Sequence, residues 1–314
     1  MNTQRHPKLF LVALFLAATL GTSARAEDID IFAGLPIDNE LPNVLIIWDN
    51  SANWSASIGV PDCSFVDGGG PKASSPGKEQ GFKMAIEKCA IYNVIDALPT
   101  GPSGEARFNI GLMLFNESPA SHSGGYPRKQ FVPLTAANKT VYKNLIRNIT
   151  IGGDKGNNAA FTKSLHEAYL MFTKAAPNVG TLGTKWDTAA VAGGRYVGAP
   201  GNGCARNHII FVANGGPGEV TDNEAKVLLA GVGGDTTKID YPTSLIKSSD
   251  QSNWADEYTR FMRNADVSSM DGVQSITTHT VAVTGASSDG LYPNFMRAMA
   301  KQGGGQYYAA DNVG

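Results

Sequence analysis

The stretch NVLIIWDNSANWS occupies residues 43–55 and decides the fold class. Its first six residues form a short, almost wholly apolar run, which is typical of a strand that is buried on both faces of a parallel sheet. The run ends at Asp49, Asn50 and Ser51, residue types that favour a turn. Polar residues in this position lie at the carboxyl edge of the sheet, where α/β proteins bind their ligands.

The rest of the chain continues the same alternation. Strand-like apolar runs occur at residues 108–115, 208–214 and 278–283, and shorter candidate strands at 129–134 and 305–310. Apolar residues at helical spacing indicate helices at residues 78–98, 138–146, 162–175, 221–229, 254–263 and 294–301. This alternation predicts an α/β fold with a doubly wound, mostly parallel sheet of the Rossmann type. We interpret residues 177–206 and 231–274 as loop and helix insertions.

The first 26 residues have the pattern of a secretory signal peptide. Arg5 and Lys8 precede an apolar run at residues 9–20, and Ala24 and Ala26 provide the small residues of a cleavage site. The run is too short to cross a bilayer comfortably, and no later apolar run reaches the length of a transmembrane segment. The sequence therefore predicts an exported protein with a leader at 27–42 and one domain at 43–314. Because it stops four residues after the last predicted strand, we also expect that domain to be truncated at its C-terminus.

Charge and cysteine usage exclude some functions. The chain has 26 basic and 28 acidic residues, and residues 1–26 hold three of the basic ones and none of the acidic ones. A mildly acidic chain is poorly suited to binding nucleic acid. Cys63, Cys89 and Cys204 lack the spacing of a metal cluster. In an oxidising compartment they predict one disulfide, Cys63–Cys89, and one free thiol. A buried, unpaired Cys89 is the alternative.

The polar turns suggest a site for a hard cation. Asp49, Ser51 and Asn53 alternate along the chain, so their side chains can converge above the sheet, and Asn214 ends another predicted strand. Carboxylate, hydroxyl and amide oxygens are the ligands of Mg²⁺ and Ca²⁺. With Asp49 as the one obvious carboxylate, we expect weak binding unless Asp154 or a partner supplies a second. The alternative is that these residues only form turns.

At these residues the sequence resembles a von Willebrand factor A domain. Such domains have a metal-ion-dependent adhesion site with the motif Asp-x-Ser-x-Ser, a Thr from a second loop and an Asp from a third. Asp49 and Ser51 match the motif, and Asn53 stands at its second Ser. The Thr position falls at Ala159, or at Asn158 with a slip of one residue, and the third-loop Asp falls at Asn214. The resemblance implies a degenerate metal site.

Longer segments resemble the N-terminal region of the PilC/PilY proteins, which are associated with the type IV pilus tip in Gram-negative bacteria. The segments are DNSANWS (49–55), EKCAIYNVIDAL (87–98), SLHEAYLMF (164–172), NWADEYTRFMRNADV (253–267), TTHTVAV (277–283) and GGGQYYAADN (303–312). The resemblance implies an adhesin and pilus biogenesis factor in the periplasm and at the cell surface, whose partners are minor pilins and a surface or host receptor. Family members carry a C-terminal β-propeller, often with a calcium loop, to which nothing here corresponds.

Two other functions remain open at this stage. One is a secreted binding protein of the same fold without a pilus role, and the other is a hydrolase with Ser51 as nucleophile. Enzyme motifs are absent: there is no GxSxG and no P-loop, and His166-Glu167 is not followed by the second histidine of a zinc protease motif. We therefore expect non-catalytic binding. Trp54, beside the predicted site, is the candidate partner contact, because aromatic residues often anchor interfaces.

Overall fold

The computed structural model describes residues 40–57, 82–117, 122–178, 183–201, 205–218, 222–237, 253–269, 271–284 and 290–310. The predicted signal peptide (1–26), most of the leader, the last four residues, Cys63 and Cys204 lie outside these described residues.

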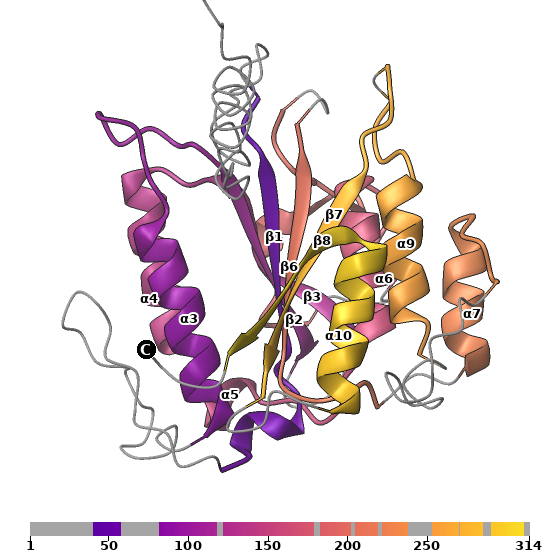
Figure 1. Ribbon diagram of the computed structural model, residues 1–314. Coiled ribbons are helices and arrows are strands. Elements are labelled where there is room, and N and C mark those ends of the chain that lie inside the picture. Colours follow the sequence, from indigo (N-terminus) through magenta and orange to yellow (C-terminus); the bar gives the residue numbers. More distant parts are fainter. Residues whose placement is uncertain are drawn as a thin grey trace, which may run out of the picture. The chain divides into compact units, whose positions relative to one another are not determined.

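A six-stranded sheet forms the centre of the described part, in the order β3-β2-β1-β6-β7-β8 (Figure 1). All neighbouring strands are parallel except β2 and β3, which are antiparallel. The strands are β1 (Asn43–Trp48), β2 (Asn109–Glu117), β3 (His122–Pro133), β6 (Asn207–Ala213), β7 (Ile276–Val283) and β8 (Gly304–Ala310).

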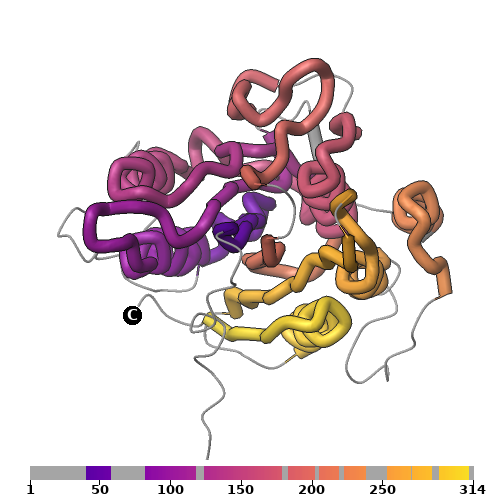
Figure 2. Tube along the Cα trace, turned by 90° about the horizontal axis from the view of Figure 1, so that it is seen from above, coloured from indigo at the N-terminus to yellow at the C-terminus, as the bar shows by residue number. Residues whose placement is uncertain are grey.

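Helices cover both faces of this sheet. Helices α3 and α4 pack together on one face, and α6, α9 and α10 pack on the other, with α7 against α6 (Figures 1 and 2). The helices are α3 (Lys83–Ala97), α4 (Ala136–Asn148), α5 (Ile151–Asp154), α6 (Phe161–Phe172), α7 (Asp222–Gly231), α9 (Ala255–Asn264) and α10 (Leu291–Gln302). The prediction of a doubly wound, mostly parallel α/β sheet is therefore confirmed.

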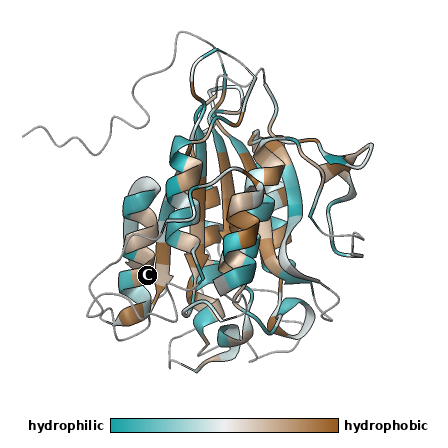
Figure 3. Cartoon of the chain, turned by 90° about the vertical axis from the view of Figure 1, so that its right-hand side faces the viewer, coloured by the Kyte–Doolittle hydropathy of each residue, from teal (hydrophilic) through white to brown (hydrophobic). Residues whose placement is uncertain are grey.

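The core lies between the sheet and its two helical layers. Leu45 and Ile47 of β1 have no exposed surface, and every residue of β2 is buried, as expected for strands covered on both sides. Figure 3 shows apolar strands enclosed by helices that alternate between apolar and polar segments. Aromatic rings from three elements meet in the middle, where Phe161 of α6 lies 4.9 Å from Phe211 and Phe115 lies 5.6 Å from Phe161, centroid to centroid.

Three asparagines join the amino ends of the central strands. Asn109 Nδ2 donates to Asn43 Oδ1 at 2.8 Å, and Asn43 Nδ2 donates to Asn207 Oδ1 at 3.0 Å. The three residues are register partners in β2, β1 and β6, and all three are buried. This amide row pairs polar groups that would otherwise be costly to bury, and of its three side-chain oxygens that of Asn109 accepts no hydrogen bond from a described group.

The structure differs from the sequence-based expectations in small elements. Strand β3 is twice as long as the six residues predicted at 129–134. As an edge strand it stays paired with β2 from His122 to Pro133, although this pairing contains three register shifts. The predicted insertion at 177–206 contains the short helix η2 (Thr188–Ala190) and a hairpin of β4 (Val191–Ala192) and β5 (Arg195–Tyr196). Within the described residues no helix is long and apolar enough to cross a membrane.

Candidate functional site at the carboxyl edge of the sheet

The loops that follow β1 and β6 meet at the carboxyl edge of the sheet. Trp48 and Val212 are register partners near the ends of these strands, so the next residues leave the sheet side by side. Asn214 Nδ2 donates to the backbone oxygen of Asp49 at 2.8 Å, and Asn214 N donates to Asp49 Oδ2 at 3.4 Å. The predicted convergence of Asp49 and Asn214 is therefore observed.

Ser51 completes this group. Its backbone N–H donates to Asp49 Oδ1 at 2.9 Å, and its hydroxyl donates to Asn214 Oδ1 at 3.4 Å. Asp49 and Asn214 have no exposed surface and Ser51 has 2%. The carboxylate of Asp49 thus accepts two backbone N–H groups, an arrangement that also orders the turn.

Asn53 and Asn158 do not join the group. Asn53 lies in the short helix η1 (Ala52–Ser55) and is exposed, with its amide against the backbone of Gly215, where a Cβ atom would lie 2.1 Å from Asn53 Nδ2. Asn158 is exposed as well, and its backbone oxygen accepts from Asn116 Nδ2 at 2.5 Å. Ala159, the other candidate for the Thr position, has no side-chain oxygen. Neither loop position therefore supplies a ligand beside Asp49.

A second carboxyl group, Glu87 of α3, faces the site and was not predicted. It has no exposed surface, and its Oε2 accepts N–H groups from both Trp48 and Trp54, the latter at 2.7 Å. Burial and, to a lesser extent, the nearby charge of Asp49 raise the pKa of Glu87 to about 8, against the hydrogen bonds from Trp48, Trp54 and Asn214. The signal in the sequence was its position: Glu87 continues the spacing of Ile91 and Ile95 on the buried face of the helix.

Lys83, the first residue of α3, brings a positive charge to the same place. Its Nζ donates to the backbone oxygen of Asn214 at 2.6 Å, and its side chain is half-buried. Burial lowers the pKa of Lys83, while the carboxyl groups of Glu87 and Asp49 oppose that shift. Burial likewise raises the pKa of Asp49 to about 6, against the hydrogen bonds from Ser51 and Asn214 and the charge of Lys83.

The proposed contact role of Trp54 is corrected by its position. Its side chain has no exposed surface, its ring lies 5.1 Å from that of Trp48, and its indole N–H is bonded to Glu87. Trp54 therefore closes the core beneath the loop, and the exposed residues of η1 are Ala52 and Asn53.

Asp154 also differs from the expectation that it could supply a second carboxylate. Its Oδ2 accepts from the backbone of Thr150 at 2.9 Å, and its Oδ1 lies 3.5 Å from Lys185 Nζ and 3.9 Å from Arg128. Its backbone oxygen accepts from Asn50 Nδ2 at 2.6 Å. The Asp154 carboxylate is thus engaged with a basic residue of strand β3 and one of another loop.

This arrangement does not fit a divalent cation. A cation among Asp49, Ser51 and Asn214 would have one carboxylate ligand, both of whose oxygens already accept N–H groups, and it would lie beside the ammonium group of Lys83. Hard cations need several charged oxygens for tight binding. Across the described ranges, no three His, Cys, Asp or Glu side chains form a group that could hold a metal ion.

The hydroxyl of Ser51 lies between the side chains of Asn214 and Asp49. It donates to the amide oxygen of Asn214, which cannot act as a general base, so nothing in this contact activates it. His166 is bonded through Nδ1 to Tyr258 at 2.8 Å, and His208 packs against His279 at the amino half of the sheet. These contacts give the three histidines packing roles.

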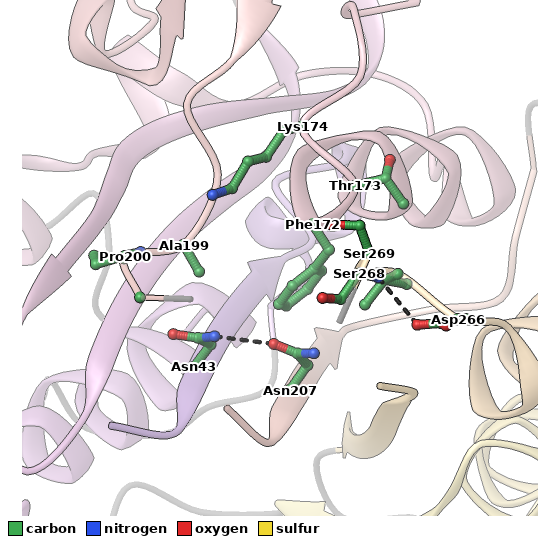
Figure 4. Close-up of a pocket in the computed structure, with 12 residues that line it drawn as sticks. Asn43, Phe172, Thr173, Lys174, Ala199, Pro200, Asn207, Asp266, Ser268 and Ser269 are labelled. Atoms are coloured by element: carbon green, nitrogen blue, oxygen red, sulfur yellow. Dashed lines mark hydrogen bonds between the residues drawn. The ribbon is translucent and has the colours of Figure 1, made fainter. Parts of the chain in front are cut away.

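A polar cavity of about 410 Å³ lies at the opposite, amino edge of the sheet (Figure 4). Asn43 and Asn207 of the amide row line it, together with Lys174, Asp266 and Phe172. Asp266 accepts from the backbone of Ser268 at 3.1 Å, and Lys174 has a left-handed backbone with φ of 56°. The sequence does not reveal this cavity, because its lining comes from five separate segments.

Cys89 of α3 is disulfide-bonded. Its two candidate partners lie outside the described residues, so the pairing with Cys63 stays a prediction. The alternative of an unpaired Cys89 is not what the structure has.

No protein-family model matches the chain, and neither does any curated protein. Solved structures with a similar fold include BatB from Bacteroides thetaiotaomicron, at 12% identity and a TM-score of 0.39 over 86% of this chain and 91% of that one. A von Willebrand factor type A protein from Catenulispora acidiphila has 13% identity and a TM-score of 0.42 over 87% and 39%. The PilB minor pilin from Streptococcus sanguinis has 11% identity and a TM-score of 0.44 over 89% and 59%. We carry no residue roles over from similarities this low.

Proposed function

We propose that this chain is an exported von Willebrand factor A-like binding protein that acts at the tip of type IV pili as an adhesin and biogenesis factor. It binds minor pilins and a surface or host receptor through the loops at the carboxyl edge of the sheet, without catalysis. The pilus role rests on the sequence segments that resemble PilC/PilY proteins.

The observation that supports this binding face is the hydrogen bond from Asn214 Nδ2 to the backbone of Asp49. It joins the loops after β1 and β6 into one rigid surface, although the two are separated by more than 150 residues in the chain. Ala52 and Asn53 are exposed on that surface, while Asp49, Ser51 and Trp54 hold it from below. A rigid platform with exposed small side chains suits recognition of a partner, because little ordering is needed on binding.

The proposal can be tested by complementing a bacterial strain from which the gene for this protein has been deleted. Asn53→Arg adds a long charged side chain to the loop face, and Val273→Arg does the same at the amino edge, where Val273 is 68% exposed. We expect the parent chain and Val273→Arg to restore pili and surface attachment, and Asn53→Arg to reduce attachment at least tenfold.

The possible failures are distinct. If the parent chain changes neither the number of pili seen by electron microscopy nor attachment, the pilus role is wrong. If the parent restores both and Asn53→Arg restores them equally, the loops at the carboxyl edge are not the binding face. In a direct binding assay, the affinity of the purified parent chain for minor pilins can then be compared with the affinities of the two variants.

A further inference from the structure

The carboxyl edge of the sheet has a positive charge of its own. Lys83 begins α3, and the backbone N–H of Lys83 donates to Ala56 at 3.1 Å, so the start of the helix is fixed to the end of the loop that follows β1. Its ammonium group then reaches the backbone oxygen of Asn214 at 2.6 Å. Figure 1 shows α3 beginning at the end of the sheet where that loop lies. Lys83 therefore contacts both loops of the site.

Two buried carboxyl groups interact electrostatically with this ammonium group, although the described part of the structure shows no ion pair between Lys83 and either of them. Asp49 and Glu87 are both fully buried, and Lys83 interacts electrostatically with each. Glu87 lies one helical turn after Lys83, so the same face of α3 carries both side chains toward the loops. Buried carboxyl groups need a compensating charge or hydrogen-bond donors, and here Lys83 supplies the charge while two indole groups and backbone N–H groups supply the donors.

The ammonium group also uses an oxygen that faces the site. The backbone oxygen of Asn214 accepts from Lys83, and its side-chain oxygen accepts from Ser51. Both oxygens of Asn214 and both of Asp49 are thus engaged by donors of this chain. A divalent cation would have to displace these donors and approach a like charge at short distance.

We propose that the Lys83 ammonium group supplies the positive charge that a divalent ion supplies in a metal-dependent site. The site is therefore assembled in the absence of Mg²⁺ or Ca²⁺, and its binding face does not depend on them. This inference concerns the same loops as the proposed function, but its test needs no partner, so the two can fail separately.

Two substitutions separate the charge of Lys83 from its hydrogen bond. Lys83→Gln keeps an N–H donor without the charge, and Lys83→Arg keeps the charge. Lys88→Met is the matched control: Lys88 is also buried on α3 and donates to a backbone oxygen, that of Ile149, at 2.7 Å, but that bond is made at the end of α4. Each variant is studied as the purified chain by thermal unfolding with EDTA or 5 mM Mg²⁺, Ca²⁺ or Mn²⁺, and by calorimetric titration with Mn²⁺.

We expect divalent cations to change the unfolding temperature of the parent chain by no more than about 1 °C, and that of Lys83→Arg by no more than the same amount. Lys83→Gln should be less stable in EDTA, should recover part of the loss with divalent cations, and should bind Mn²⁺ at least tenfold more tightly than the parent. Lys88→Met should be destabilised without any response to cations.

Three results would overturn the inference. One is stoichiometric Mn²⁺ or Mg²⁺ binding by the parent chain that is lost in Asp49→Asn, which needs no lysine variant. Another is a Lys83→Gln chain as stable as the parent and equally insensitive to cations. The third is a Lys83→Gln chain that behaves like Lys88→Met, which would make Lys83 an ordinary structural lysine.

Discussion

Glu87→Gln tests the electrostatics of the site most directly. The side chain is fully buried, and its pKa rises from an ordinary 4.5 to about 8, first because of burial and then because of Asp49. The folded-state pKa is above the unfolded one, so the group's contribution to stability is intact below pH 4.5 and is lost as the pH rises toward 8. From these two values, the free-energy penalty is about 1 kcal/mol at pH 5 and about 3 kcal/mol at pH 7.

Glutamine has nearly the same shape and does not ionise, so it removes this penalty while its oxygen still accepts from Trp48 and Trp54. We therefore expect the stability of Glu87→Gln, relative to the parent, to increase by about 2 kcal/mol between pH 5 and pH 7. Urea unfolding followed by circular dichroism measures this difference. The control Glu105→Gln changes an exposed carboxylate and should shift stability by less than about 0.5 kcal/mol at either pH. A difference between Glu87→Gln and the parent that is the same at both pH values would refute the reasoning.

Two further predictions concern the core around and beyond the site. Trp54→Ala should lose about 3–5 kcal/mol of stability in urea unfolding, because it leaves a cavity beside Trp48. Trp54→Phe should lose less, because it keeps a six-membered aromatic ring. A loss below about 1 kcal/mol for Trp54→Ala would mean that the residue is not part of the core. Burial lowers the pKa of His166 from 6.5 to about 4. The contribution of the neutral His166 side chain to the free energy of unfolding is therefore present above pH 6.5 and lost as the pH falls toward 4. Between pH 7 and pH 5 the parent should therefore lose about 2 kcal/mol more than His166→Gln, and equal losses would contradict this.

The strands that are buried on both faces were predictable from their apolar runs alone. β1 coincides with its predicted segment, and β6 and β7 each differ from their own predicted segments by one or two residues at the ends. The smaller elements were not predictable in this way. In the four-residue helix α5 the Thr150 side chain accepts from the backbone of Gly153, and the Asp154 side chain accepts from the backbone of Thr150 just before the helix. Periodicity has no meaning over so few residues.

The candidate site was predictable where a rule of topology applied and not elsewhere. Parallel neighbours end at the same edge, which places Asp49 beside Asn214 whatever the details of the loops. Lys83 and Glu87 were missed because charged residues in a helix are normally assigned to its solvent-exposed face. Trp54 was predicted as a partner contact because it lies beside the site and aromatic residues often anchor interfaces, whereas its bond to Glu87 directs it inward.

The amide row at the amino edge has a consequence for the opposite edge. Apolar parallel strands carry little information about how far each should slide past the next, because shifting one by two residues exchanges one aliphatic side chain for another. In β2, β1 and β6 such a shift would separate Asn109, Asn43 and Asn207 and strand their amides in the interior. These asparagines therefore fix the register of the three strands at the amino edge, and with it the relative positions of Asp49 and Asn214 where β1 and β6 end at the carboxyl edge.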